Sequence, residues 1–324
     1  MRIRLIDADS IIPNLALMQI SGYHKSIGDK VGFNVNLPDK VYLSVIFKEN
    51  ADQAMGLLTY YYKKLTERDI DIDFGGSGLN LDLNPYLPEK MQKFYPDYEL
   101  YNGLICQKCQ NQIRFCKCSP RKPIKGNMDY SMGFTTRGCI RKCSFCIVPD
   151  KEGKLHHWQH PKEFYNPEFK KIMLLDNNWL ADKKWFFETS DWIMDHKLKI
   201  IEHGMDIRLI DMEIAQRLKE LKFQKGMHFA FDSIKDEYAV KRGIAILKKA
   251  KIDIRSRVQF YVLVGFDTTQ DQDKYRCRLL KSLGTNAFVM PYVKNAWTNK
   301  IARWANRKES YWTCDIDDYD RSIA

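Results

Sequence analysis

The sequence lacks any run of about 18 apolar residues, so it offers no candidate for a membrane-spanning helix. Its opening stretch, MRIRLIDADSIIPNLALMQISGYH, also lacks the basic segment, uninterrupted apolar stretch and small-residue cleavage site of a secretory signal. We therefore expect a cytoplasmic protein. In that reducing compartment, cysteines serve metals or catalysis more often than disulfides.

Internal repeats and low-complexity segments are also missing, and the hydrophobic fraction of 44% is ordinary for a globular protein. The 324 residues suffice for one large domain or two ordinary ones. The formal net charge of +11 favours an anionic partner such as a nucleic acid, a nucleotide or an acidic surface.

The first 98 residues alternate between strand-like and helix-like patterns. Segments rich in β-branched and aromatic residues predict strands at 2–8, 30–36, 40–47 and 71–78. Helices are expected at 14–26 and 51–66. The second is predicted from an apolar stripe, which consists of Ala54, Leu57, Leu58, Tyr61, Tyr62 and Leu65. Because strands that alternate with helices indicate a parallel sheet, residues 1–98 are predicted to form a Rossmann-like α/β domain.

Residues 99–131 break this pattern, and we interpret them as a basic connector with four cysteines. The alternation resumes over 132–292 and predicts six further strands at 132–136, 171–176, 198–203, 227–232, 257–264 and 286–290. Six βα units in succession predict a partial (βα)6 barrel, with ligands at the carboxyl ends of its strands. Residues 293–324 are expected to add a C-terminal helix and tail.

Three cysteines, Cys139, Cys143 and Cys146, follow the first strand of this second half with the spacing C-x3-C-x2-C. Three thiolates on one tight loop can ligate three irons of a cubane iron–sulfur cluster. The fourth iron then has no protein ligand, and such an open position is what a catalytic metal requires. Gly138 permits a sharp turn before the first ligand.

The stretch GCIRKCSFC, which follows a strand and opens a run of βα units, resembles the radical S-adenosylmethionine (radical SAM) superfamily. Phe145 matches the aromatic residue before the last cysteine, and the resemblance covers 132–292. It implies a [4Fe–4S] cluster that binds SAM, receives an electron from a reductant such as flavodoxin or ferredoxin, and yields a 5′-deoxyadenosyl radical. A zinc site or a chance cluster of cysteines is the alternative.

The same resemblance extends to candidate cofactor-binding residues. LLDNNW contains Asp176, Asn177 and Asn178, which resemble the motif that contacts the SAM amine in the methylthiotransferase-like branch. VLVGFD resembles the adenine-contacting turn, where Gly265 allows close backbone approach. Three polar residues lie near predicted strand ends: Glu202, Asp232 and Arg257. We expect each of them either to face SAM or the substrate or to have a purely structural role.

The end of the first domain, DFGGSGLNLDLNPYLPEKMQKFYPDY, resembles the cobalamin-binding-like domain that precedes many radical SAM barrels. The D-x-H-x-x-G signature, whose histidine ligates cobalt, is absent, and His24 lacks that context. We expect this fold without cobalamin, and cobalamin held without a histidine ligand is the alternative.

A second cysteine set, Cys106, Cys109, Cys116 and Cys118, has the spacing of a zinc knuckle. Zinc is the expected metal, an auxiliary iron–sulfur cluster is the competing interpretation, and the remaining alternative is no metal. No acidic residue lies between Tyr101 and Met128, so this segment suits phosphate contact or is a solvated basic loop.

Together these features predict a radical SAM enzyme that modifies a nucleic acid or nucleotide, such as RNA or DNA. One alternative is a radical SAM enzyme, with or without cobalamin, that acts on a small molecule or peptide. The other is a non-enzymatic metal-binding nucleic-acid protein.

Overall fold

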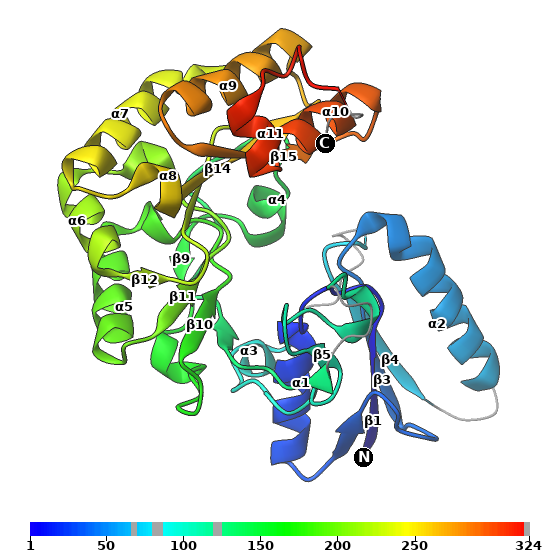
Figure 1. The fold of residues 1–324 in the computed structure, drawn as a ribbon. Helices are drawn as coiled ribbons and strands as arrows, with labels where there is room; N and C mark the ends of the chain where they lie inside the picture. The colour runs from blue at the N-terminus through cyan, green and yellow to red at the C-terminus, as the bar shows by residue number, and fades with distance from the viewer. Residues whose placement is uncertain (66–69, 80–86, 119–124, 321–324) are drawn as a thin grey trace. The chain divides into compact units, whose positions relative to one another are not determined.

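The computed structural model of the chain describes residues 1–65, 70–79, 87–118 and 125–320, which form two compact units (Figure 1). The first unit combines Met1–Gly133 with Lys162–Phe169, and the second combines Phe134–Pro161 with Lys170–Ala324. Both contain parallel strands and helices, so the predicted α/β class is confirmed. None of the helices described is long and apolar enough to serve as a membrane span.

The four strands predicted in the first unit form one parallel sheet in the order β2-β1-β3-β4. They are shorter than the predicted ranges, with bounds β1 Arg2–Asp7, β2 Lys30–Gly32, β3 Lys40–Ser44 and β4 Asp71–Gly75. Ile3, Leu5 and Tyr42 of this sheet belong to the same buried core as Leu17 and Ile20 of helix α1 (Leu15–Ser26).

Two helices follow the predicted order in this unit. Helix α1 begins directly after Asn14, whose side chain accepts the backbone N–H of Leu17 and so satisfies one free helix donor. Helix α2 spans Ala51–Leu65 and buries Ala54, but Leu57 is 39% exposed, so the predicted apolar stripe is not buried along its whole length. Four side chains of that stripe lie outside the described residues: Leu58, Tyr61, Tyr62 and Leu65.

The predicted connector belongs to the first unit and has more structure than its composition indicates. Strand β5 (Ile105–Cys106) pairs antiparallel with β6 (Lys125–Gly126), and Tyr101 is completely buried. The other regular elements of this part of the unit are α3 (Glu89–Gln92) and β7 (Ser131–Gly133).

In the second unit, parallel strands pair in the orders β12-β11-β10 and β13-β14-β15, and an isolated parallel bridge pairs Met205, which follows β11, with Phe229 of β13. The bounds are β10 Lys171–Leu174, β11 Lys199–Ile201, β12 Lys222–Phe223, β13 Met227–Ala230, β14 Val258–Val264 and β15 Asn286–Pro291. The predicted strand 132–136 is divided between β7 and β8 (Thr136–Arg137), and β8 pairs antiparallel with β9 (His156–His157).

Helices α5, α6 and α7 follow one another along one side of these strands (Figure 1). The helices of this unit are α4 Val148–Glu152, α5 Lys183–Asp195, α6 Met212–Glu220, α7 Glu237–Lys249, α8 Ile254–Arg257, α9 Gln270–Ser282, α10 Ala296–Ala305 and α11 Lys308–Thr313. Helix α7 buries one stripe of residues: Val240, Gly243, Ile244 and Leu247. In α10, Ile301 and Trp304 are fully buried, so this helix packs on the core of the second unit.

The two faces of strand β14 differ in how deeply their side chains are buried. Val258, Phe260, Val262 and Val264 are at most 1% exposed, whereas the residues between them are only half-buried. Successive side chains of a strand point to opposite faces, so one face of β14 packs in the core and the other is less covered.

Candidate functional site

The three-cysteine loop lies between β8 and α4 in the second unit, and Gly138 sets its first turn. The φ angle of Gly138 is +74°, and a Cβ atom at this position would lie 2.3 Å from the carbonyl oxygen of Lys154. The backbone N–H of Cys139 donates to the carbonyl of Gly153 at 3.3 Å, which closes the loop. Only glycine therefore fits before the first cysteine.

Glu152, the last residue of α4, stabilises the base of this loop through hydrogen bonds and an ion pair. Its carboxylate accepts the N–H of Gly138 at 2.9 Å, pairs with Arg137 at 2.8 Å and accepts the side-chain amide of Asn177 at 2.7 Å. Burial raises the pKa of Glu152, but Arg137 and these donors outweigh it, so the pKa is lowered and the group is ionised. No motif in the sequence had pointed to Glu152.

Asp176 stabilises the segment that enters the loop through hydrogen bonds. It is 5% exposed and accepts four hydrogen bonds, from the backbone N–H and the hydroxyl of both Thr135 and Thr136, at 2.6–2.9 Å. Burial raises the pKa of Asp176, and the four donors partly offset the effect. Asp176 and Asn177 of the predicted SAM-amine motif thus contact the chain around the cysteine loop.

Asn178, the third residue of that motif, differs from the other two. It is 3% exposed, and its buried Oδ1 has no hydrogen-bond partner among the described residues. A buried acceptor without a donor is costly in a folded protein, so such an atom marks a place where a ligand donor would be stabilising.

Cys139, Cys143 and Cys146 are free and half-buried. The N–H of Arg141 donates to Cys139 Sγ at 3.4 Å, and the N–H of Cys146 donates to the carbonyl of Cys143 at 3.0 Å. Burial raises the pKa of Cys143. The nearby Arg208 opposes this effect, while the other two thiols and Asp232 add to it. The loop therefore carries three free thiols, of which none is fully buried.

A chain of charged residues adjoins these thiols. Asp206, whose side chain is 7% exposed, pairs with Arg141 at 2.9 Å and with Arg208 at 2.7 Å, and Arg208 also pairs with Asp236 at 3.3 Å. Burial opposes ionisation of Asp206, but the two guanidinium groups lower its pKa. Asp206 thereby holds positive charge beside the cysteines, where it stabilises thiolates.

The structure brings Phe145 next to the turn that follows β14. Its ring meets that of Phe266 edge to face at 5.8 Å, and Phe266 contacts Tyr292 in the same way at 4.7 Å. Gly265 has a φ of +76°, and a Cβ atom there would lie 2.9 Å from the Thr298 methyl. Two segments about 120 residues apart, both predicted to contact SAM, therefore adjoin each other.

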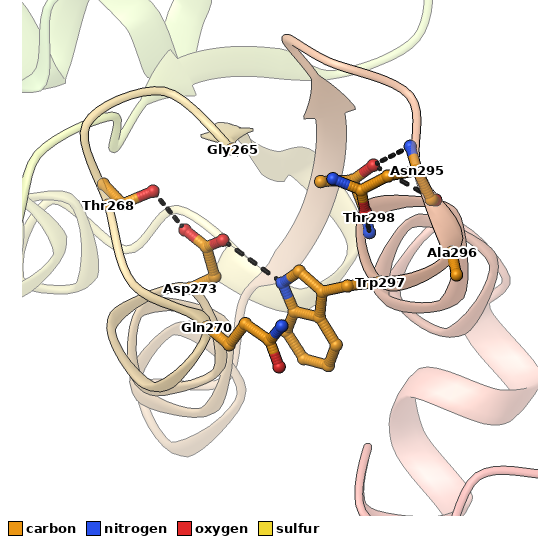
Figure 2. Close-up of a pocket in the computed structure, with 8 residues that line it drawn as sticks. All are labelled: Gly265, Thr268, Gln270, Asp273, Asn295, Ala296, Trp297 and Thr298. Carbon is orange, nitrogen blue, oxygen red and sulfur yellow. Dashed lines mark hydrogen bonds between the residues drawn. The ribbon is translucent and has the colours of Figure 1, made fainter.

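A pocket of about 440 Å³ opens beside Gly265 (Figure 2). It is bounded by the first residues of α9 and α10. Figure 2 shows Asp273 between Thr268, whose hydroxyl donates at 2.8 Å, and Trp297, whose indole N–H lies at 3.5 Å. The buried carboxylate also pairs with Arg276, so its charge is neutralised within the unit.

The three other predicted residues lie at strand ends, in different environments. Asp232 accepts the N–H of Leu263 at 2.9 Å, and burial raises its pKa. Glu202 accepts both the N–H and the ring Nδ1 of His228 at 2.7 Å. Arg257 precedes β14, at the amino ends of the strands.

The guanidinium group of Arg257 donates to three backbone carbonyls at the end of α6, those of Leu218, Lys219 and Leu221. This geometry gives Arg257 a structural role away from the cysteine loop and does not support a contact with SAM.

The second cysteine set lies in the first unit. The sulfur atoms of Cys106, Cys109, Cys116 and Cys118 all lie within 4.8 Å of one another, so this group could bind a metal ion. Backbone N–H groups, chiefly that of Cys109, lower the pKa of Cys106 to about 6. Among the described residues, the sulfurs of the three-cysteine loop form no group as tight as this one.

No protein-family model matches the sequence. A stretch of 130 residues is 28% identical to the bacteriochlorophyllide d C-8(2)-methyltransferase of Chlorobaculum tepidum. This chain is distantly similar to an enzyme. The matched stretch makes up 40% of this chain and 26% of the relative, so the chain spans about a quarter of the length of the curated relative that it matches.

Proposed function

We propose that this chain is a radical SAM enzyme in which Cys139, Cys143 and Cys146 hold a [4Fe–4S] cluster. The observation that carries the proposal is the support of the cysteine loop. Glu152 and Asp176 accept backbone N–H groups of Thr135, Thr136 and Gly138, on the segment that enters the loop, and the three thiols that follow are free. A distant likeness to a methyltransferase agrees with an enzyme.

The residues present fit such a cluster. Three free thiols on one loop of eight residues can bind three irons of a cubane. Arg141 and Arg208 place positive charge beside the thiols. Three protein ligands leave one iron open for SAM.

When bound, the cluster would supply the electron that splits SAM into methionine and a 5′-deoxyadenosyl radical, which takes a hydrogen atom from the substrate. The buried Oδ1 of Asn178 is an acceptor suited to the SAM ammonium group. The aromatic edge at Phe145 and Phe266, beside the left-handed turn at Gly265, suits the adenine ring. A reductant such as flavodoxin or ferredoxin would deliver the electron.

The test is production of 5′-deoxyadenosine from SAM by anaerobically reconstituted protein with a chemical reductant. We expect Cys143→Ala to lose this activity and the cluster iron. The matched control is Cys314→Ala, which changes a half-buried cysteine in the same unit whose thiol donates to the Ser310 carbonyl. Wild-type protein that assembles the cluster and still yields no 5′-deoxyadenosine would support a non-enzymatic metal protein instead.

A nucleic acid or nucleotide is the proposed substrate class, since the chain carries a net charge of +11. The second candidate is a small molecule, because the matched methyltransferase is named for bacteriochlorophyllide d. Stimulation of 5′-deoxyadenosine formation by RNA or DNA would support the first class. Stimulation by bacteriochlorophyllide d, or a cobalamin spectrum in protein from cobalamin-fed cells, would support the second.

A further inference from the structure

We propose that Cys106, Cys109, Cys116 and Cys118 form a closed site for a single Zn²⁺ ion, which holds the segment between them onto the end of strand β1. This site belongs to the first unit and is separate from the cysteine loop of the second. Its role is structural, so the proposal goes beyond the enzymatic function.

The spacing of the sulfur atoms selects a single ion. Zinc–sulfur bonds of about 2.3 Å in a tetrahedron place the sulfurs about 3.8 Å apart. The distance between Cys109 Sγ and Cys116 Sγ is 3.8 Å, and all four sulfurs lie within 4.8 Å of one another. In a cubane, four cysteines bind four different irons and their sulfurs are more widely separated. The geometry therefore disfavours an auxiliary cluster, the competing interpretation from the sequence.

The backbone holds the ligands in this arrangement. The N–H of Cys106 donates to the carbonyl of Asn111, and the N–H of Gln110 donates back to the carbonyl of Cys106, both at 2.8 Å. This tight turn brings Cys109 back toward Cys106. The N–H of Cys118 donates to Cys116 Sγ at 3.4 Å, a bond that stabilises a thiolate. Four protein ligands leave no open position, which is typical of structural zinc.

The segment between the two ligand pairs carries the contacts to the sheet. Gln112 is 5% exposed and donates from Nε2 to the carboxylate of Asp7 at 2.8 Å and to the carbonyl of Ser10 at 2.7 Å. Arg114 pairs with the other oxygen of Asp7 at 3.1 Å. Asp7 is the last residue of β1.

A metal that holds Cys109 and Cys116 together therefore fixes two of the side chains, Gln112 and Arg114, that contact the buried carboxylate of Asp7. Loss of the ion frees the six residues between Cys109 and Cys116, and Asp7 then keeps Tyr101 and the N–H of Ser10 as donors. Metal binding and the order of the first unit are coupled in this way, as is usual where a small segment has little apolar surface of its own.

The first experiment measures zinc and iron by mass spectrometry in the full chain, in wild type and in the triple variant Cys139→Ala, Cys143→Ala, Cys146→Ala. We expect about one zinc per chain in both proteins and almost no iron in the triple variant. Iron with sulfide in the triple variant, iron alone, or no metal would each overturn the zinc site. Because this variant removes the ligands of the proposed catalytic cluster, its metal content tests the zinc site alone. The wild-type iron content and 5′-deoxyadenosine formation test the catalytic cluster.

Cys109→Ser is expected to lower the zinc content at least about tenfold, since one of four ligands is lost. Cys314→Ser, a half-buried cysteine outside both sets, serves as the matched control and should keep its zinc. If Cys109→Ser does not fold, the wild type titrated with a strong chelator gives the same comparison.

The second experiment measures amide hydrogen exchange with and without the chelator. We expect zinc removal to speed exchange at Gln112 and Ile113, whose N–H groups bond to Ile11 and Leu104, at least about tenfold. Amides of β14 in the second unit should not change, and added zinc should restore protection. Unchanged exchange at Gln112 in zinc-free protein would overturn the coupling to β1.

Discussion

The carboxylate of Glu152 accepts the backbone N–H of Gly138 at 2.9 Å, and this bond joins the residue before Cys139 to the end of helix α4. Glu152 lies six positions after Cys146, so one side chain closes the loop that carries all three thiols. Support of this kind sets ligand positions before a cofactor binds.

Replacing Glu152 by glutamine should therefore impair the cluster without removing a ligand. The side-chain NH₂ of the new glutamine would face Gly138, Arg137 or Asn177. All three donate hydrogen bonds to the carboxylate of Glu152, so a donor in its place cannot accept them. We expect iron retention or 5′-deoxyadenosine formation to fall about 10- to 100-fold. The control is Asp150→Asn, an exposed acid on the same helix, which should behave as wild type. Equal iron content and activity in the two variants would show that Glu152 does not support the loop.

Asp176→Asn should destabilise the second unit. All four hydrogen bonds to this buried carboxylate come from donors, so an amide NH₂ leaves at least one of them unsatisfied. The expected loss is about 1–3 kcal/mol in the free energy of unfolding, measured by urea titration. Asp195→Asn, at the exposed end of α5, is the comparison and should change little. A stability equal to wild type would contradict the role assigned to Asp176.

Gly265→Ala should cost more than Gly284→Ala, although both glycines have positive φ angles, +76° and +84°. The left-handed backbone costs either alanine about 1–2 kcal/mol. Only at Gly265 does the added Cβ meet another atom, the Thr298 methyl at 2.9 Å, whereas nothing lies within 4 Å at Gly284.

Urea unfolding of both variants isolates the steric contribution, and equilibrium dialysis with SAM tests the proposed adenine contact. If both variants bind SAM as the wild type does, the turn at Gly265 is not part of the SAM site.

Acid should weaken the attachment of the C-terminal residues to α9. The side-chain hydrogen bonds of Arg278 lower the pKa of Asp315 to about 2 from its usual 3.8. Because the folded-state pKa is the lower one, this pair stabilises the fold above about pH 4, and the contribution is lost as the pH falls toward 2.

Asp315→Asn should thus reduce the unfolding temperature more at about pH 5 than at about pH 2.5. Asp318→Asn, an exposed neighbour, should show no such pH dependence. A deficit of equal size at both pH values would mean that the charge of Asp315 is unimportant.

Nucleic-acid binding by this chain should depend on the basic segment around the proposed zinc site. Lys117 and Lys125 are exposed there, and changing both to glutamine should lower the slope of log affinity against log salt by about 1.4–1.8. Lys248 and Lys249 on α7 are equally exposed and serve as a charge-matched control. Salt-insensitive or absent binding of RNA and DNA would argue against this substrate class.

Helix α5 shows where periodicity in the sequence is insufficient. Its buried residues, Phe186, Thr189, Ser190 and Ile193, have helical spacing, but the middle two are polar. Thr189 is tolerated inside because its hydroxyl donates to the Trp185 carbonyl and accepts the indole N–H of Trp179. A stripe judged by apolar residues alone does not include such positions.

The sequence by itself determined the α/β class, the order of the strands along the chain, and the two cysteine sets. These features are local, because strand periodicity and ligand spacing are properties of neighbouring residues. Tertiary structure alone decided which distant groups meet. Glu152 and Asp206 support the cysteine loop, Phe145 adjoins Phe266, and Gln112 reaches Asp7 across 105 residues. Such pairings depend on how strands and helices pack, which short-range sequence patterns do not encode.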